Sequence, residues 1–385
     1  MDMKKDIFFQ LSQNAAERLA ERFGTPLLVL SLEQIEKNYR FLKKHLPRVQ
    51  LYYAIKANPH QRILELLRDL GSCFDVASDG EIRTLAAMGI DGERLIYANP
   101  IKTGGGLQAC CDVGVHKMTF DSESEIVKMA QGCPGATVLL RIRIDNSSAH
   151  VDLNKKFGVG RERAVELLQA AQAAGLDAAG VCFHVGSQTM SADPYLNALD
   201  LAREIFEEAG TRPVLAILMV DNYEDLMKNL TENERSAIYS EINARLDEDF
   251  PNVEIWAEPG RFMCGTAVNL ITSVIGVTER GGQPWYFLDD GLYGTFSGVI
   301  FDQWDFKLIS FKEGEEVEAT FAGPSCDSLD IMFRGKLTVR QEVGDLLLVP
   351  SCGAYTSASA TTFNGFSKAN FIVWEDLKDE IEPQP

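Results

Sequence analysis

Two patterns of hydrophobic and polar residues divide the chain near residue 265. Between residues 26 and 265, short apolar runs alternate with longer stretches of helical periodicity such as Arg161–Ala174. Apolar runs bounded by turn residues predict buried strands, and strands that alternate with amphipathic helices predict a parallel sheet. About eight such repeats over this length fit a (β/α)8 TIM barrel. The expected strands are Pro26–Leu30, Leu51–Ile55, Cys73–Val76, Arg94–Tyr97, Lys117–Phe120, Thr137–Ile144, Gly180–His184, Val214–Val220 and Val253–Ala257.

The remaining residues predict a second domain made of β-strands. After residue 266, short alternating runs are separated by clusters of Gly, Pro and Asp, which is typical of a β-sandwich or a barrel-like sheet. One helix, Ala15–Phe23, is expected in the first 25 residues and should pack against this sheet. The prediction is therefore an α/β protein with a barrel of residues 26–265 and a β domain of residues 1–25 and 266–385. Its expected strands are Thr272–Val277, Trp285–Leu288, Val317–Phe321, Leu346–Val349 and Phe371–Trp374.

Composition narrows the classes of partner. The 385 residues carry a net charge of -19, which argues against nucleic acid or an anionic membrane surface as a partner. No apolar run reaches the length of about 18 residues that a transmembrane helix needs. The eight cysteines are scattered without metal-like spacing, so we expect free thiols, no metal and a reducing cytoplasm.

A lysine and an acid stand at neighbouring strands of the predicted barrel. Lys56 follows the apolar run Leu51–Ile55, and Asp75 lies inside the next expected strand. A buried cation is costly, so Lys56 needs a lowered pKa or a partner, and Asp75 is the candidate. An amine with a lowered pKa can form a Schiff base. A lysine that reaches solvent remains the alternative for an isolated case.

Other polar residues follow later strands and helix starts. Glu81 begins a helix, where it suits the dipole, and His184 ends a strand before a Gly-Ser187 turn that suits an anion. Glu258 closes a buried strand, and Arg261 follows a Pro-Gly turn from which it can reach a phosphate. Each also has an ordinary structural interpretation, as a dipole acid, a core histidine or a loop ion pair.

The β domain adds a thiol, acids and a phenol on turns. Cys326 and Asp327 lie in Gly-Pro-Ser-Cys-Asp, Tyr355 follows Cys-Gly-Ala, and Asp302 stands among aromatic residues. Taken singly, each is ordinary loop chemistry. Taken with the barrel residues they fit one cofactor, because pyridoxal phosphate requires a lysine, a group against its ring, an acid at its ring nitrogen and donors for its phosphate.

These motifs resemble a known family along residues 26–375. The chain is similar to the fold-type III, alanine-racemase-like pyridoxal-phosphate decarboxylases, and most of all to the bacterial ornithine/lysine decarboxylases. The motifs that carry the resemblance are Tyr53-Ala-Ile-Lys-Ala-Asn, Phe74-Asp-Val-Ala-Ser, Ile96-Tyr-Ala-Asn-Pro, His184-Val-Gly-Ser-Gln, Glu258-Pro-Gly-Arg, Gly323-Pro-Ser-Cys-Asp and Phe363-Asn-Gly-Phe.

The resemblance implies a cofactor site for pyridoxal 5′-phosphate in the barrel. Lys56 would hold the cofactor covalently, His184 would stack on its ring, and Glu258 would keep its ring nitrogen protonated. The full set implied to bind the cofactor is Lys56, Asp75, Glu81, Arg141, His184, Ser187, Glu258, Arg261 and Tyr355.

The resemblance also implies a substrate, a proton donor and a partner subunit. Asp302 and Asp327 would receive the distal ammonium of a basic L-amino acid, and Cys326 would return a proton to its Cα. In the family the second half of the site comes from the other subunit. It therefore implies a homodimer with shared active sites, in which Cys326, Asp327 and Phe363 cross over.

Two departures from the family pattern concern the cofactor phosphate and the substrate. Where the family carries a glycine-rich phosphate loop, this chain has Leu218-Met219-Val220-Asp221. Side chains there obstruct a close backbone approach and Asp221 repels a phosphate, so weaker cofactor binding is expected. In addition, Phe301 stands where the family has Tyr, which removes a hydroxyl near the substrate.

The favoured function is decarboxylation of L-ornithine or L-lysine to putrescine or cadaverine. One alternative is a catalytically impaired, regulatory paralog similar to antizyme inhibitors, which the replaced glycine loop supports. Another is a decarboxylase of a modified amino acid. Diaminopimelate decarboxylase is disfavoured, because Cys326-Asp327-Ser328 departs from its Cys-Glu-Ser pattern. The choice between ornithine and lysine stays open at this point.

Overall fold

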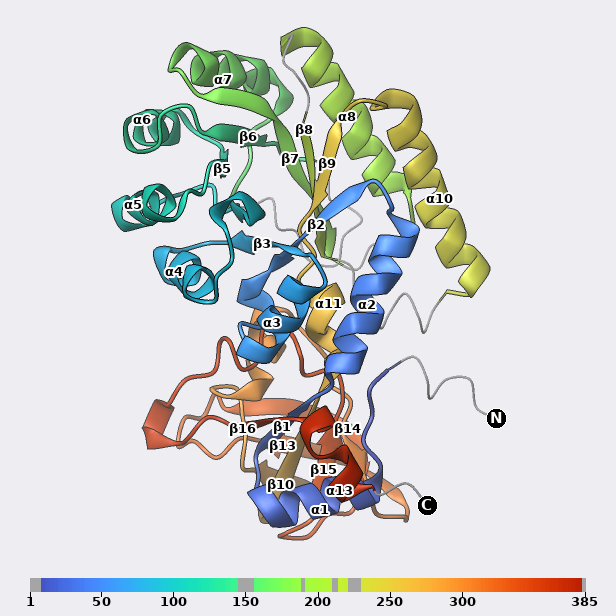
Figure 1. Ribbon diagram of the computed structural model, residues 1–385. Coiled ribbons are helices and arrows are strands. Elements are labelled where there is room, and N and C mark those ends of the chain that lie inside the picture. The colour runs from blue at the N-terminus through green and yellow to red at the C-terminus, as the bar shows by residue number, and fades with distance from the viewer. Residues whose placement is uncertain (1–7, 145–155, 188–190, 210–213, 221–229, 383–385) are drawn as a thin grey trace. The chain divides into compact units, whose positions relative to one another are not determined.

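The computed structural model describes residues 8–144, 156–187, 191–209, 214–220 and 230–382, and for 185–187 and 214–220 it describes the backbone alone. The chain forms two compact units (Figure 1). One comprises residues 38–262 and the other residues 1–37 and 263–385.

The first unit is a closed barrel of eight parallel strands. The strands pair in chain order, and the last closes on the first with Leu51 opposite Ala257. This confirms the (β/α)8 barrel predicted from the alternating pattern. The strands are β2 (Val49–Ala54), β3 (Cys73–Val76), β4 (Leu95–Tyr97), β5 (Lys117–Phe120), β6 (Thr137–Arg141), β7 (Asp177–Ser187), β8 (Val214–Val220) and β9 (Glu254–Ala257).

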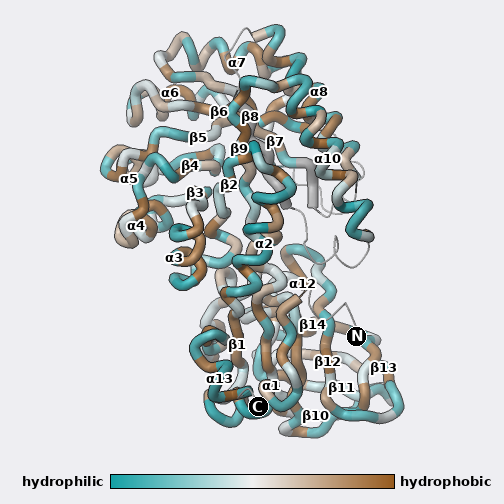
Figure 2. Tube along the Cα trace, turned by 45° about the vertical axis from the view of Figure 1, so that its right-hand side comes forward, coloured by the Kyte–Doolittle hydropathy of each residue, from teal (hydrophilic) through white to brown (hydrophobic). Residues whose placement is uncertain are grey.

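Helices surround this barrel (Figure 1). Their tubes alternate between hydrophobic and hydrophilic stretches in Figure 2, as amphipathic helices on a sheet require. Local caps fix where several of them begin: Ser78 Oγ accepts the Glu81 N–H at 3.3 Å, and Thr231 and Glu234 form a capping box. The helices are α2 (Leu32–His45), α3 (Gln61–Asp69), α4 (Asp79–Ala87), α5 (Gly104–Val113), α6 (Glu123–Gly132), α7 (Arg161–Ala173), α8 (Asp193–Ala209), α10 (Glu232–Asp249) and α11 (Arg261–Cys264).

The second unit is built mainly from strands, as predicted. Its sheet runs in the order β12-β15-β10-β11-β13-β14, and β1 pairs with both β10 and β16. Strand β14 had no counterpart in the sequence prediction, because Arg334, Gly335 and Lys336 interrupt its apolar pattern. The elements are α1 (Gln13–Phe23), β1 (Leu27–Leu30), β10 (Val268–Arg280), β11 (Gln283–Leu288), α12 (Gly298–Phe301), β12 (Ile309–Ser310), β13 (Glu316–Ala322), β14 (Ile331–Val339), β15 (Leu346–Val349), β16 (Asn370–Val373) and α13 (Lys378–Ile381).

Strand β1 corrects one expectation about the barrel. The run Pro26–Leu30 was predicted as a barrel strand, but β1 pairs antiparallel with β10 and parallel with β16 in the second unit. The observed division therefore falls at residue 38 instead of residue 26. All four β1 residues are buried, and a fully buried strand has the same local pattern in either sheet.

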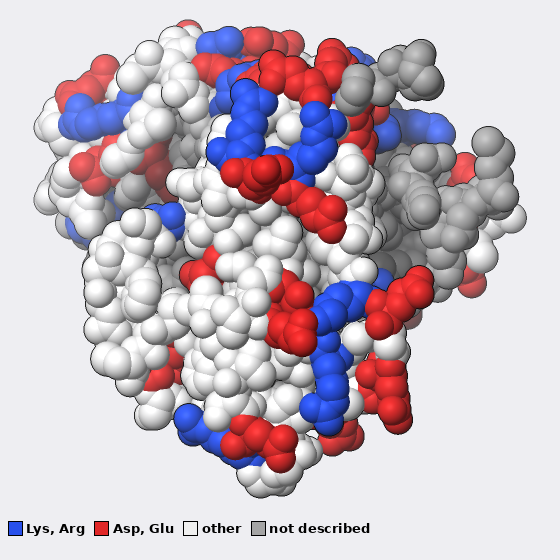
Figure 3. Space-filling view, turned by 90° about the horizontal axis from the view of Figure 1, so that it is seen from below, with Lys and Arg blue, Asp and Glu red and all other residues white. Residues whose placement is uncertain are grey.

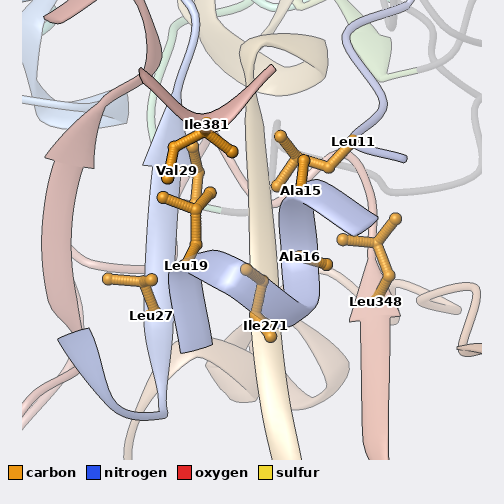
Figure 4. Close-up of a cluster of buried hydrophobic side chains, with 9 residues drawn as sticks. All are labelled: Leu11, Ala15, Ala16, Leu19, Leu27, Val29, Ile271, Leu348 and Ile381. Carbon is orange, nitrogen blue, oxygen red and sulfur yellow. The ribbon is translucent and has the colours of Figure 1, made fainter. Parts of the chain in front are cut away.

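The N-terminal helix packs into the core of the second unit, as expected. Figure 4 shows Ala15, Ala16 and Leu19 of α1 facing Ile271 of β10 and Leu348 of β15. These side chains are buried, so α1 belongs to the folded core of this unit. The cluster as a whole comprises Leu11, Ala15, Ala16, Leu19, Leu27, Val29, Ile271, Leu348 and Ile381.

The distribution of surface charge and the character of the helices are relevant to binding of nucleic acid and of membranes. On the face drawn in Figure 3, basic and acidic side chains lie next to each other, so the net negative charge is not gathered there into one patch. Among the helices that the structure describes, none combines the length and apolar character needed to cross a bilayer.

A carboxylate from the C-terminal segment caps the start of helix α2, whose first residues, up to residue 37, belong to the same unit as that segment. Glu375 Oε2 accepts the Leu32 N–H at 2.9 Å, and Oε1 accepts the Ser31 hydroxyl at 2.9 Å and the Glu33 N–H at 3.1 Å. The first N–H groups of a helix have no partner within the helix, so an anion at this position satisfies them and matches the dipole.

We expect Glu375→Ala to lower the free energy of unfolding by about 1 to 3 kcal/mol, since it leaves these N–H groups without their acceptor. Urea titration followed by circular dichroism measures the change. The control is Asp379→Ala, which removes an exposed acid from the same segment. Equal stability of the two variants would contradict the capping role.

Candidate active site

Lys56 and Asp75 form an ion pair at one rim of the barrel. Lys56 lies in a short 3-10 turn directly after β2, and the register of β2 with β3 places Ala54 opposite Asp75. The Lys56 Nζ lies 2.6 Å from Asp75 Oδ2. Asp75 is 1% exposed, whereas the Lys56 side chain is 43% exposed. The acid expected to accompany Lys56 is therefore found beside it, and the amine remains accessible.

Glu258 is a buried carboxyl whose hydrogen-bonding capacity is unused. It directly follows β9 and is 3% exposed, and neither Oε1 nor Oε2 has a hydrogen-bond partner among the described residues. Its pKa is raised to about 8, mainly by burial and then by the nearby Asp75, while Lys56 and Arg141 act in the opposite direction. A buried carboxyl without a donor is costly, so the site is suited to a donor supplied by a ligand.

Arg141 and His184 lie on the two strands that follow one another in the barrel. Arg141 ends β6, is buried, and its Nε has no hydrogen-bond partner among the described residues. His184 is buried on β7, and its pKa lies well below the usual range because of burial and then because of Arg141 and Lys56. The imidazole is therefore neutral, which suits packing of its flat face against a ring.

Glu81 serves the turn that begins helix α4. Its Oε2 accepts the Ala77 N–H at 2.6 Å, and its own N–H donates to Ser78. Burial raises the pKa of Glu81, and the bond from Ala77 lowers it. The contact with Ala77 supports the structural interpretation of Glu81 as an acid at a helix start. The nearby Asp75 raises the pKa of the same carboxyl.

Of the barrel residues predicted to bind the phosphate, the structure describes the side chain of Arg261 but not that of Ser187. Arg261 is buried at the start of α11, and the preceding turn is tied to the end of β2 because the Ala54 N–H donates to the Pro259 carbonyl at 3.1 Å. Ser187 ends β7, and its side chain lies outside the described residues.

Only part of the segment that replaces the family's glycine-rich loop lies within the described residues. Leu218, Met219 and Val220 belong to strand β8, described by its backbone alone, while Asp221 lies outside the described residues. Weaker binding of the cofactor through this segment remains a prediction.

The barrel residues fit pyridoxal phosphate. Among the described residues, neither the Glu258 oxygens nor the Arg141 Nε has a hydrogen-bond partner, although all three atoms are buried, and a protonated ring nitrogen is a donor that would suit Glu258. Lys56 offers an accessible primary amine beside a buried acid, which suits condensation with an aldehyde. This chemistry follows from the donors and acceptors present at the rim.

A second group of predicted residues is clustered in the β unit. The Cys326 N–H and Sγ both donate to Asn364 Oδ1, at 3.2 and 3.3 Å. Asp327 accepts hydrogen bonds from the Tyr293 hydroxyl and from the Leu329 N–H, and these two bonds lower its pKa, the Leu329 bond more strongly. Asp327 is thus held as an anion beside an exposed thiol.

Tyr293 and Asn364 are the members of this cluster that sequence reasoning did not assign. The Tyr293 and Phe363 rings stack with centroids 4.2 Å apart, so the predicted substrate residue Phe363 belongs to the same cluster. Asn364 lies inside the Phe363-Asn-Gly-Phe motif, which was a usable signal. Nothing in the local sequence of Tyr293 indicated a bond to a residue 34 positions away.

The remaining predicted residues lie on turns of the β unit. Asp302 follows α12 and is half-buried, and its neighbour Phe301 is 70% exposed. Tyr355 has a left-handed backbone with φ of 56°, and its carbonyl accepts the hydroxyls of Ser297 at 3.3 Å and Ser359 at 2.8 Å. The turn that presents Tyr355 is therefore rigidly held.

Comparison with known proteins identifies the family. Residues 32–265 match the family model described as pyridoxal-dependent decarboxylase, pyridoxal binding domain. The chain is 49% identical to the lysine/ornithine decarboxylase of Selenomonas ruminantium over 370 residues, which cover 96% of this chain and 94% of that protein.

Solved structures agree in fold along nearly the whole chain. A crystal structure of SrLDC in complex with PLP and cadaverine superposes with a TM-score of 0.88 at 46% identity, covering 98% of this chain and 100% of that one. The lysine/ornithine decarboxylase of Vibrio vulnificus, complexed with cadaverine, gives a TM-score of 0.85 at 34% identity and covers 94% and 99%. The chain therefore belongs to the pyridoxal-dependent decarboxylases and is a PLP-dependent amino-acid decarboxylase.

Proposed function

We propose that this enzyme removes the α-carboxylate of L-lysine, L-ornithine or both and releases cadaverine or putrescine. The observation that carries the proposal is Asp327, which two donors hold as an anion beside the thiol of Cys326. An anionic carboxylate suits the distal ammonium of a basic amino acid through a charge-assisted hydrogen bond. Relatives named lysine/ornithine decarboxylase, one of them solved with cadaverine, support the same substrate class.

The barrel residues divide the work of holding the cofactor. When bound, pyridoxal phosphate supplies an electron sink for the bond to the departing carboxylate. Lys56 provides the anchoring amine, with Asp75 as its counter-ion. Glu258 would accept a hydrogen bond from the ring nitrogen and keep a proton on it, because its carboxyl has no donor among the described residues. His184 packs its neutral ring against the cofactor.

Cys326 completes the proton balance. Loss of carbon dioxide leaves Cα one proton short of the amine product, so a group near Cα must donate one. The Cys326 sulfur carries a proton, since it donates to the oxygen of Asn364. The thiol therefore supplies that proton, and solvent returns it because Cys326 is exposed.

A homodimer with shared sites is part of the proposal. Large apolar side chains are exposed on the β unit, among them Phe301 at 70%, Leu329 at 72% and Phe363 at 41%. Exposed apolar groups of this size beside functional residues favour a protein interface. A second copy, which would cover them and bring Cys326 and Asp327 to the partner's barrel, is the occupant that the family resemblance implies.

The anchoring amine has a spectroscopic test. The protein incubated with pyridoxal phosphate should absorb above roughly 400 nm through the cofactor bound to Lys56, and Lys56→Ala should lose this band. Lys44→Ala, which changes an exposed lysine on α2, should keep it. Release of carbon dioxide from lysine, ornithine, arginine and diaminopimelate then identifies the substrate. A band that persists in Lys56→Ala, or no release from lysine and ornithine, would contradict the proposal.

The unpaired carboxyl of Glu258 predicts a pH-dependent stability of the cofactor-free protein. Its folded pKa is raised from 4.5 to about 8, so the folded state binds the extra proton between these values and loses stability as pH rises through that window. Glu258→Gln should therefore stabilise the cofactor-free protein by about 1 to 3 kcal/mol at pH 8 and much less at pH 5. Thermal melts at both pH values measure this, with the exposed Glu241→Gln as control. The same gain at both pH values would refute the assignment.

Shared active sites predict recovery of activity by mixing two impaired variants. Lys56→Ala should be inactive as a homodimer, and Cys326→Ala should retain only a small, measurable residual activity. Random exchange makes half of the dimers mixed, and each mixed dimer has one intact site of two, so about a quarter of the activity returns. Lys56→Ala mixed with His184→Ala is the control and should stay inactive, since both changes lie in the barrel unit. Absence of recovery, with exchange verified by different affinity tags, would exclude shared sites.

A further inference from the structure

Asn364 occupies a backbone conformation that few side chains adopt. It lies in the short turn Phe363–Gly365 with φ of 53° and ψ of 14°, and Gly365 follows with φ of 79°. Left-handed φ values are costly for residues with a Cβ, and asparagine is among those that tolerate them best. The turn thus holds an amide side chain where most other residues would be strained.

The amide of Asn364 makes two contacts with one residue. The Cys326 N–H lies 3.2 Å and the Cys326 Sγ 3.3 Å from Asn364 Oδ1. A backbone N–H can only donate, so the oxygen of the amide, and not its nitrogen, faces Cys326. That oxygen can only accept, so the sulfur contributes its proton to the second bond. The two bonds fix the backbone position of Cys326 and the direction of its thiol proton.

The turn that carries Asn364 is itself anchored. The Thr361 N–H donates to the Tyr293 carbonyl at 2.8 Å, and the Phe363 N–H donates to Thr361 Oγ1 at 3.2 Å. The Phe363 ring stacks on the Tyr293 ring, and the Tyr293 hydroxyl donates to Asp327. The turn that carries Asn364 and the carboxylate of Asp327 are therefore both bound to Tyr293. This common partner fixes the thiol of Cys326 and the acid relative to each other.

We propose that Asn364 is a positioning residue for the proton donor, whose side-chain oxygen accepts the S–H and N–H bonds of Cys326 and so fixes the direction of its thiol proton. The inference rests on the proposed function, because it assigns a purpose to the proton that Cys326 carries. Asn364 acts only through Cys326. A purely structural turn residue would support the loop without controlling the chemistry of the thiol.

Two substitutions separate these roles. Asn364→Ala removes the acceptor, which favours thiolate at Cys326, while Asn364→Asp keeps an acceptor of the same shape and adds a negative charge that disfavours thiolate. Mere loosening of the loop would change the reactivity of Cys326 in the same direction in both variants. The control is Asn370→Ala, which removes an exposed amide that donates to the Phe23 carbonyl on the same unit.

The test is alkylation of Cys326 by iodoacetamide, followed by mass spectrometry of its peptide in the full-length enzyme. Cys111, the second exposed cysteine among the described residues, is the internal reference in every sample. At pH 7.5 the ratio of the Cys326 rate to the Cys111 rate should rise about threefold to tenfold in Asn364→Ala, fall in Asn364→Asp and stay unchanged in Asn370→Ala. Equal ratios in wild type and both Asn364 variants, or a rise in both, would overturn the inference.

Turnover provides the second arm. Asn364→Ala should lower kcat about threefold to tenfold with little change in KM, and it should have no further effect in a Cys326→Ala background, since it acts through that thiol. An undiminished effect in that background would overturn the inference. If the wild-type enzyme decarboxylates no basic amino acid, the proposed function fails, while the alkylation ratios still decide whether Asn364 controls Cys326.

Discussion

The barrel gathers more buried carboxyl groups at one rim than its own donors satisfy. Asp75 has Lys56 within 2.6 Å, but Glu258 is buried with both oxygens unpaired among the described residues. Leaving such a group without a donor costs about 1 to 3 kcal/mol, which the rest of the fold must offset. A ligand that brings its own protonated nitrogen recovers that cost on binding. The buried carboxyl of Glu258 thus lowers the stability of the ligand-free protein and raises the affinity for such a ligand at the rim where chemistry is expected.

Parallel strand order is what makes this concentration of charge feasible. Lys56, Asp75, His184 and Glu258 come from strands distributed across about 200 residues, yet their strand ends share one rim of a closed barrel. Burial lowers the pKa of His184 and raises that of Glu258, whereas the cations Arg141 and Lys56 lower the pKa of both groups. One environment therefore yields a neutral imidazole and a carboxyl with high proton affinity.

The β unit organises its polar residues by a different principle. Cys326 and Asp327 lie on turns, where no strand ladder fixes them, and hydrogen bonds from Tyr293 and to Asn364 take over that task. Turn residues of this kind depend on side-chain partners for their geometry. A substitution at Tyr293 or Asn364 is therefore expected to change the position of the acid or the thiol, although neither partner is itself one of the reacting groups.

The amino-acid sequence by itself determined the positions of all eight barrel strands, the α1 helix and the candidates Lys56 and Asp75, because period and burial are local properties of the chain. Only the tertiary structure decided that β1 joins the β unit, that β14 exists, that Glu258 lacks a donor within the described part of the chain and that Asn364 contacts Cys326. Local patterns report that a segment is buried but not which segment it meets. Hydrogen bonds between residues 34 or 38 positions apart arise only when the folded backbone brings them together.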